Sequence, residues 1–156
     1  MDSKIEMMSQ MVAGMLQNIV DEQVAKNATT NLDSVLEFIK NASVGYIGVQ
    51  RDEKTLLPTF YYKKIPSIDD DTQVIILDPM LATGGSLSYA IDLVKKEGAK
   101  NIICATIVSV QEGIDKVLNN HPNVSIYTCA KDLKLNEKGY IVPGLGDCGD
   151  RLFGTK

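Results

Sequence analysis

The sequence is poor in cysteine and in basic side chains. Its 156 residues include only three cysteines, Cys104, Cys129 and Cys148, which lie far apart without a C-x-x-C pair. This spacing indicates neither a disulfide framework nor a zinc site, and it favours a reduced, cytosolic setting. Sixteen basic against 20 acidic side chains leave a net charge of −4, so no positive field would gather nucleic-acid phosphates. No apolar run approaches the roughly 18 residues of a membrane span. We therefore expect a cytoplasmic protein that binds neither nucleic acid nor membrane.

What is present is the composition of one globular domain. Apolar residues make up 44% of the chain, enough to build a core at this length. Near the start they recur at helical spacing from Ile5 to Ile19 and again from Leu32 to Ile39, which predicts two helices. Five of the six methionines fall in the first 15 residues. This soft stripe favours a core-facing helix, with a helix that docks on another subunit as the alternative.

From residue 44 onward the pattern becomes that of alternating strands and helices. The strands are continuous apolar runs, which are typical of a parallel sheet with helices covering both faces. Residues 56–64 are rich in β-favouring types and predict a hairpin-like arm. We therefore predict an α/β fold, with strands over 44–49, 74–78, 101–108 and 124–129 and helices over 86–97 and 111–120.

The strongest local motif follows the strand predicted at 74–78. The segment Asp78-Pro-Met-Leu-Ala-Thr-Gly-Gly-Ser86 leads from that strand into a helix. Amides at a helix start attract anions, and glycines let the backbone approach a phosphate closely. We expect the anionic Asp78 to face a sugar or a metal instead. The alternative is an ordinary turn with Ser86 as the N-cap. No lysine follows the glycines, so the motif is not a Walker A loop.

A second motif lies near the carboxyl end. Five glycines, one proline and two aspartates occur between residues 139 and 154, and we expect no regular element there. Apolar residues such as Tyr140, Ile141 and Leu145 indicate that the segment is nevertheless packed down. An anchored, glycine-rich loop of this kind often wraps a small ligand and reads it with backbone groups.

Together these segments resemble the uracil phosphoribosyltransferases. DPMLATGGS at 78–86 resembles their ribose-phosphate loop, and GYIVPGLGDCGDRLFGTK at 139–156 their base-binding tail. The segment GVQRDEKT at 48–55 also matches, with the β-arm at the expected distance. The resemblance covers residues 44–156. It implies a type I phosphoribosyltransferase-like parallel sheet flanked by helices, with a β-arm hairpin. The implied reaction, part of pyrimidine salvage, transfers 5-phosphoribosyl from phosphoribosyl pyrophosphate (PRPP) to uracil and gives UMP and diphosphate.

The resemblance also implies a set of site residues and partners. Asp78 and Arg51 would be the catalytic residues, Arg51 would contact the diphosphate, and Asp147 would reach both PRPP and uracil. Uracil would be read mainly by backbone groups of Ile141, Gly146 and Cys148. Mg²⁺ would arrive bound with PRPP, and no residue is assigned as a metal ligand. A dimer or tetramer is implied, and some relatives are activated by GTP. The remaining PRPP-binding residues would be Pro79, Met80, Leu81, Ala82, Thr83, Gly84, Gly85 and Ser86.

The amino-terminal part departs from the family. The family is longer there and has an I-L-R-A-G loop that binds diphosphate, a string that this sequence lacks. An ungapped register places Lys26 over that loop, whereas a rival register places Glu6 there. We therefore divide the chain into a divergent or shortened helical segment, 1–43, and a phosphoribosyltransferase core, 44–156. Besides an active enzyme, a non-catalytic UMP-binding regulator and a shortened remnant stay open.

Overall fold

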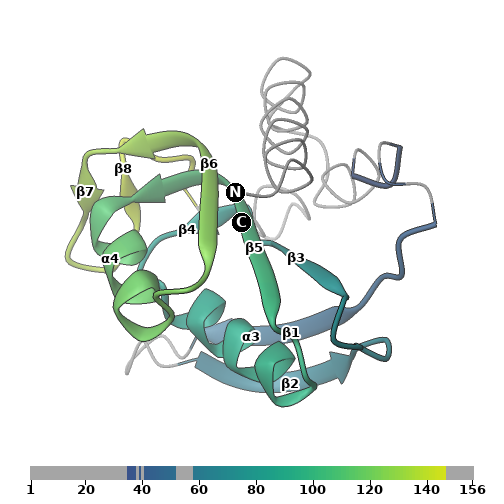
Figure 1. Cartoon of the computed structure of the whole chain (residues 1–156). Helices are drawn as coiled ribbons and strands as arrows, with labels where there is room; N and C mark the ends of the chain where they lie inside the picture. The colour runs from purple at the N-terminus through teal and green to yellow at the C-terminus, as the bar shows by residue number, and fades with distance from the viewer. Residues whose placement is uncertain (1–34, 38, 40, 52–57, 147–156) are drawn as a thin grey trace.

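A four-stranded parallel sheet forms the centre of the computed structural model, which describes residues 35–37, 39, 41–51 and 58–146 (Figure 1). The predicted α/β class is therefore confirmed. The elements follow one another as β1 (Tyr46–Arg51), β2 (Pro58–Lys64), β3 (Gln73–Leu77), β4 (Met80–Leu81), α3 (Gly85–Lys96), β5 (Asn101–Val110), α4 (Gln111–Asn120), β6 (Ser125–Asp132), β7 (Lys134–Leu135) and β8 (Ile141–Val142).

Strand β5 is the central strand of the sheet. Its first half pairs with β3 and its second half with β4, while β6 runs along the opposite edge. β3 and β4 are thus two parts of one edge, interrupted at Asp78 and Pro79. The Pro79 carbonyl oxygen bridges the interruption by accepting the N–H groups of Ile107 and Val108, each at 3.1 Å. This break is where the predicted ribose-phosphate loop begins.

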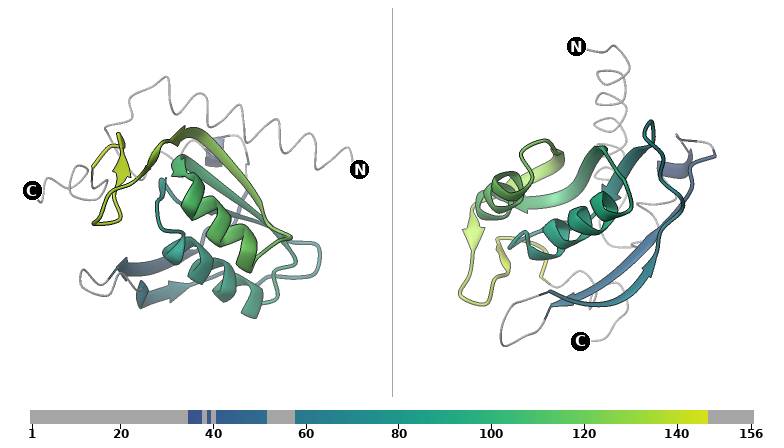
Figure 2. Two further views of the ribbon diagram at one scale, coloured as in Figure 1. Left: turned by 90° about the vertical axis from the view of Figure 1, so that its left-hand side faces the viewer. Right: turned by 60° about the horizontal axis from the view of Figure 1, so that its bottom comes forward.

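Helices α3 and α4 lie side by side on one face of the sheet (Figure 2). Helix α3 lies in the connection from β3 to β5, and α4 lies in the connection from β5 to β6, so the two connections cross the sheet in the same direction. Because such crossovers are right-handed, both helices lie on the same face. Helices were expected on both faces of the sheet, and the two described helices confirm this expectation for one face. Between these helices and the sheet lies the main core, made of Leu81, Leu87, Ile91, Val94, Ala99, Ile102, Cys104, Val117 and Val124.

The structure has a β-arm hairpin, but its strands differ from the prediction: residues 58–64 form the single strand β2, and its partner β1 comes from the run expected to be a buried strand at 44–49. That apolar run was expected to be a buried strand, but β1 pairs antiparallel with β2 outside the parallel sheet. Tyr46 in β1 is 56% exposed as a result. The hairpin contacts α3, where the ring of Phe60 lies 6.1 Å from that of Tyr89. Apolar content alone did not distinguish an arm that packs on a helix from a core strand.

Most of the amino-terminal expectations fall on residues outside the described ranges. The helix predicted for residues 5–19 falls there, as does Lys26. Residues 35–37 are helical, inside the helix predicted for 32–39. The division of the chain after residue 43 remains a prediction. Among the described helices, none has both the length and the apolar character that a membrane span requires.

Candidate functional site

The two predicted ligand-binding loops meet at one cavity of about 380 Å³. The first loop connects β3 to α3, and the second follows β7, more than 50 residues further along the chain. Their convergence places the cavity beyond the carboxyl end of β3, where parallel sheets commonly bind ligands. The lining residues are Val49, Asp78, Met80, Leu81, Ala82, Thr83, Gly84, Gly85, Ser86, Leu87, Gly139, Tyr140, Ile141 and Gly146.

Glycine determines how the first loop enters helix α3. Gly84 is the N-cap, with a left-handed φ of 73°, and the helix begins at Gly85. No side chain caps the helix, so the alternative in which Ser86 is the N-cap is wrong. The reason is that the tight turn needs a positive φ, which glycine adopts without strain. Amide donors of the first turn therefore remain without a side-chain partner at the wall of the cavity.

The first loop is backed by helix α4. Gly113, in the first turn of α4, is buried, and a Cβ placed on it would collide with the Ala82 carbonyl oxygen and lie 3.1 Å from that of Leu81. Only glycine allows the helix backbone to approach the loop backbone this closely. Gly113 was not predicted from the sequence, because it lies 27 positions beyond Ser86 and belongs to no local motif.

Asp78 carries a carboxyl group at the point where β3 gives way to the loop. Its backbone N–H donates to the Ala105 carbonyl at 3.1 Å, and its Oδ1 accepts the Met80 N–H at 3.2 Å. Burial raises the pKa of Asp78 to about 6, and the Met80 hydrogen bond offsets only part of this rise. At neutral pH the side chain is thus a partly desolvated anion in the cavity wall. Such an anion is stabilised by hydroxyl donors or cations that a ligand brings to it.

The second loop is more regular than expected. The segment was predicted to hold no regular element, but β8 pairs antiparallel with β7, Leu135 facing Ile141. Asn136 makes this possible, because its Oδ1 accepts the N–H groups of Lys138 and Tyr140, both at 3.0 Å, and closes the turn. Ile141 is 3% exposed and packs against Val108 and Val110. The loop is therefore anchored to the sheet, as its apolar residues indicated.

The structure brings together ten of the predicted site residues. Eight come from the first loop, and Ile141 and Gly146 come from the second. Pro79 does not line the cavity, because its carbonyl is engaged by β5. Arg51 ends β1, opposite Pro58, and its side chain is not described, while Lys26, Asp147 and Cys148 lie outside the described residues. The cavity is also lined by four residues that were not predicted to bind substrate: Val49, Leu87, Gly139 and Tyr140.

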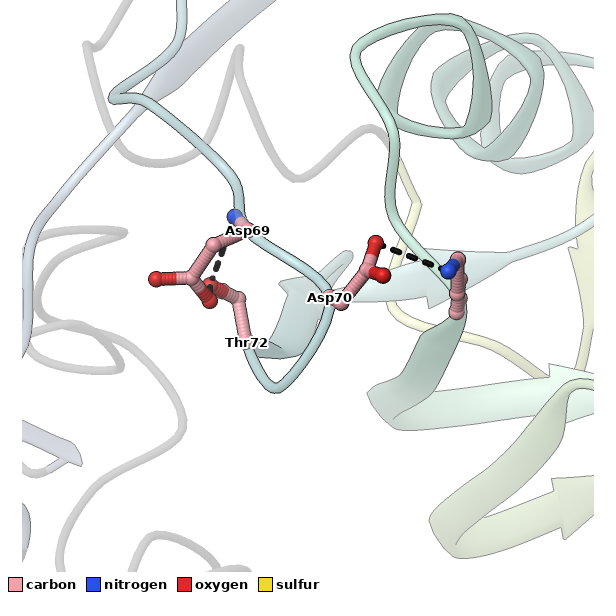
Figure 3. Close-up of polar contacts among 4 residues, drawn as sticks. Asp69, Asp70 and Thr72 are labelled. Carbon is pink, nitrogen blue, oxygen red and sulfur yellow. Dashed lines mark hydrogen bonds and ion pairs between the residues drawn. The ribbon is translucent and has the colours of Figure 1, made fainter.

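The three acidic residues before β3, at positions 69–71, do not line the cavity. They lie in a turn that is held by hydrogen bonds between Asp69 and Thr72 (Figure 3). Thr72 Oγ1 donates to the Asp69 carboxylate and accepts the Asp69 N–H, while Asp70 pairs with Lys100 at 2.7 Å. Both partners of that pair are well exposed, so it contributes little to stability. In the part of the chain that the structure describes, no group of three or more His, Cys, Asp or Glu side chains could hold a metal ion.

Comparison with known proteins gives one consistent family. A family model for uracil phosphoribosyltransferase matches residues 29–155. Curated uracil phosphoribosyltransferases from Thermosipho melanesiensis and Streptococcus mutans are 57% and 56% identical over 124 and 125 residues. Each match covers 80% of this chain, which spans about 60% of the length of these relatives.

Solved structures agree with this result. The AQ2163 protein from Aquifex aeolicus is 35% identical with a TM-score of 0.75, and the match covers 82% of this chain and 61% of that one. An adenine phosphoribosyltransferase from Giardia lamblia, solved with 9-deazaadenine, shares the fold alone: it is 16% identical, with a TM-score of 0.52 and 84% of each chain covered. By its sequence match, its fold and its two converging loops, the chain belongs to the uracil phosphoribosyltransferase family.

Proposed function

We propose that this protein transfers 5-phosphoribosyl from PRPP to uracil and releases UMP and diphosphate. The observation that carries the proposal is that the ribose-phosphate loop, Asp78–Ser86, and the base loop, Ile141–Gly146, line one cavity. A nucleotide has an anionic end and a planar base, and a site for it needs both kinds of wall at a fixed separation. The family membership supports the same reaction.

In this proposal the 5-phosphate binds at the start of α3. The uncapped amides that follow Gly84 supply donors and partial positive charge, and Thr83 and Ser86 add hydroxyl groups. Asp78 is anionic and would repel the phosphate, so it binds the ribose hydroxyls. Those hydroxyls donate to its carboxylate and replace part of the hydration that burial removes.

Uracil would be read by backbone groups of the second loop. Gly146 has a left-handed φ of 76°, and a Cβ on it would meet no atom within 4 Å, so this stretch of backbone borders open space. Exposed amides and carbonyls match the alternating acceptors and donors on the edge of a pyrimidine. Asp147 and Cys148 continue the same loop in the proposal, with Cys148 contributing through its backbone and Asp147 reaching both substrates.

The diphosphate would be held by Arg51 and Lys26 together with Mg²⁺. A magnesium ion that arrives on the diphosphate keeps several waters and needs only one or two protein carboxylates. Asp78 is the carboxylate among the described lining residues, and that donor set fits an ion of this kind. When bound, Mg²⁺ neutralises part of the charge on the leaving group.

The chemistry needs no covalent nucleophile. The bond from the anomeric carbon to the diphosphate oxygen breaks, its electron pair leaves with the diphosphate, and positive charge builds on that carbon. A uracil ring nitrogen forms the new bond, and its proton passes to water. The protein contributes by holding both substrates in line and by placing the Asp78 carboxylate near the developing charge. We further propose that the protein is a cytoplasmic dimer or tetramer, with GTP as a candidate activator.

The experiment is turnover. Purified protein, shown to be folded by circular dichroism, is incubated with labelled uracil, PRPP and Mg²⁺, and UMP is measured by chromatography. We expect UMP to form and to require Mg²⁺, and Asp78→Asn to reduce the rate by at least about 100-fold. A folded protein that forms no UMP would contradict the proposal. UMP binding without turnover would identify the non-catalytic regulator instead, and the absence of both would identify the remnant.

A further inference from the structure

We propose that Asp132 is a positioning residue for the base loop. Its carboxylate Oδ2 accepts the backbone N–H of Gly144 at 2.9 Å. Gly144 lies between Ile141 and Gly146, the two described residues that are proposed to read uracil. The inference rests on the proposed function and deepens it, because it assigns to a residue outside the cavity the task of shaping the uracil subsite.

The loop makes a tight turn at the point where Asp132 holds it. Gly144 has a left-handed φ of 59°, and a Cβ on it would collide with the Ile141 carbonyl oxygen. The bond from Asp132 therefore acts at the centre of the turn. Beyond the turn, Gly146 is exposed, and a Cβ on it would meet no atom within 4 Å. A hydrogen bond to a charged acceptor is a strong restraint for such a segment.

Asp132 lies where strand β6 is held by both β5 and α4. It is the last residue of β6, half-buried, and paired in register with Val110 at the end of β5. Lys131 next to it donates from Nζ to Gln111 Oε1 at 3.0 Å, which ties the end of β6 to the start of α4. α4 is also the helix whose Gly113 backs the ribose-phosphate loop. The same support thus holds both loops, which fixes the distance between the phosphate and base subsites.

Asp132 does not line the cavity, so its effect must pass through Gly144. This distinguishes it from a residue that contacts uracil directly. Loss of its acceptor would loosen the uracil loop and leave the ribose-phosphate loop intact. The expected signature is a weaker affinity for uracil at an unchanged affinity for PRPP.

The test compares three variants of the full chain. Asp132→Ala removes the acceptor, and Asp132→Asn keeps an oxygen acceptor without the charge. The control, Glu137→Ala, removes an exposed carboxylate from the turn between β7 and β8. We expect Asp132→Ala to raise the KM for uracil about tenfold, with the KM for PRPP changed less than about twofold. Asp132→Asn should restore most of the uracil KM, and Glu137→Ala should match the parent. Equal changes in both KM values, or no change in either, would overturn the inference.

A second measurement decides the inference without turnover. Amide hydrogen exchange, followed by NMR, reports protection of the Gly144 N–H directly. We expect exchange at Gly144 to become at least about tenfold faster in Asp132→Ala than in Asp132→Asn, while the amides of β5 stay as protected as in the parent. Unchanged protection at Gly144 would overturn the inference even if the enzyme is active. If the parent forms no UMP, the proposed function fails and this measurement still decides the role of Asp132.

Discussion

A Cβ on Gly84 would come within 2.7 Å of the Gly113 carbonyl oxygen, so the start of α3 and the first turn of α4 pack backbone against backbone. The two helices meet directly at the N-terminus that is proposed to bind phosphate. Contacts of this kind lack flexible side chains that could absorb a change. The position of α4 therefore determines the shape of the ribose-phosphate loop.

Replacing Gly113 with alanine should separate the loop from α4. The new Cβ would collide with the Ala82 carbonyl oxygen, so the helix or the loop must move. We expect the free energy of unfolding, measured with urea, to fall by about 1–3 kcal/mol, the usual cost of overpacking. The KM for PRPP should rise more than the KM for uracil.

Lys116→Ala is the matched control, because Lys116 is exposed on the same helix. Its free energy of unfolding should stay within about 0.5 kcal/mol of the parent value. If Gly113→Ala is as stable as Lys116→Ala and binds PRPP equally well, the position of α4 does not determine the shape of the ribose-phosphate loop.

Replacing Asp78 with asparagine should stabilise the protein at neutral pH, although it is expected to slow the reaction at least about 100-fold. The folded pKa of about 6 lies above the ordinary 3.8, so the folded state holds the proton more tightly than the unfolded chain. Keeping the carboxylate charged in the folded state therefore costs up to about 3 kcal/mol above pH 6. Asparagine removes this cost and retains an acceptor for the Met80 N–H. Chemical unfolding at pH 7.5 should thus show Asp78→Asn to be more stable than the parent.

The stability difference between Asp78→Asn and the parent should depend on pH. The advantage of Asp78→Asn should shrink as the pH falls through 6 and vanish below about pH 4, where Asp78 is protonated in both states. Asp71→Asn, at an exposed position of the acidic loop, is the control for the removal of one carboxylate. A variant at Asp78 that is less stable than the parent at pH 7.5 would contradict burial as the cause of the raised pKa.

The thiol of Cys104 should be inert in the folded protein. The side chain is fully buried, and burial together with the nearby Asp78 charge raises the pKa of the thiol to about 12. At pH 8 only about one molecule in ten thousand would carry the reactive thiolate. We expect iodoacetamide at pH 8 to leave Cys104 unlabelled for hours, as followed by peptide mass spectrometry, and to label it rapidly in guanidinium chloride. Rapid labelling in the native protein would show that the core opens locally.

Helices α3 and α4 and strand β5 could be predicted from local sequence patterns. The helix predicted for 111–120 matches α4 residue for residue, and the one predicted for 86–97 differs from α3 by one residue at each end. The strand predicted at 101–108 continues to Val110 as β5. These elements were accessible because a continuous apolar run or a helical period reflects burial that the neighbouring residues share.

Features that depend on distant partners were not accessible. The run at 44–49 has the composition of a core strand but pairs with β2 in an exposed hairpin. The pairing of β8 with β7 follows a turn that Asn136 closes. Gly113 and Asp132 act on loops that are 12 or more positions away in the sequence, through a backbone contact and a single hydrogen bond. No local motif marks such residues, because their role arises from tertiary packing.

Binding of UMP tests the central claim, that the two loops form one nucleotide site, most directly. Isothermal titration calorimetry would compare UMP with its two parts, ribose 5-phosphate and uracil, on the folded protein. We expect UMP to bind at least about 100-fold more tightly than either part, because both loops then hold one ligand. Asp132→Ala should weaken UMP and uracil and leave ribose 5-phosphate unchanged. A folded protein that binds UMP no better than ribose 5-phosphate would contradict the account.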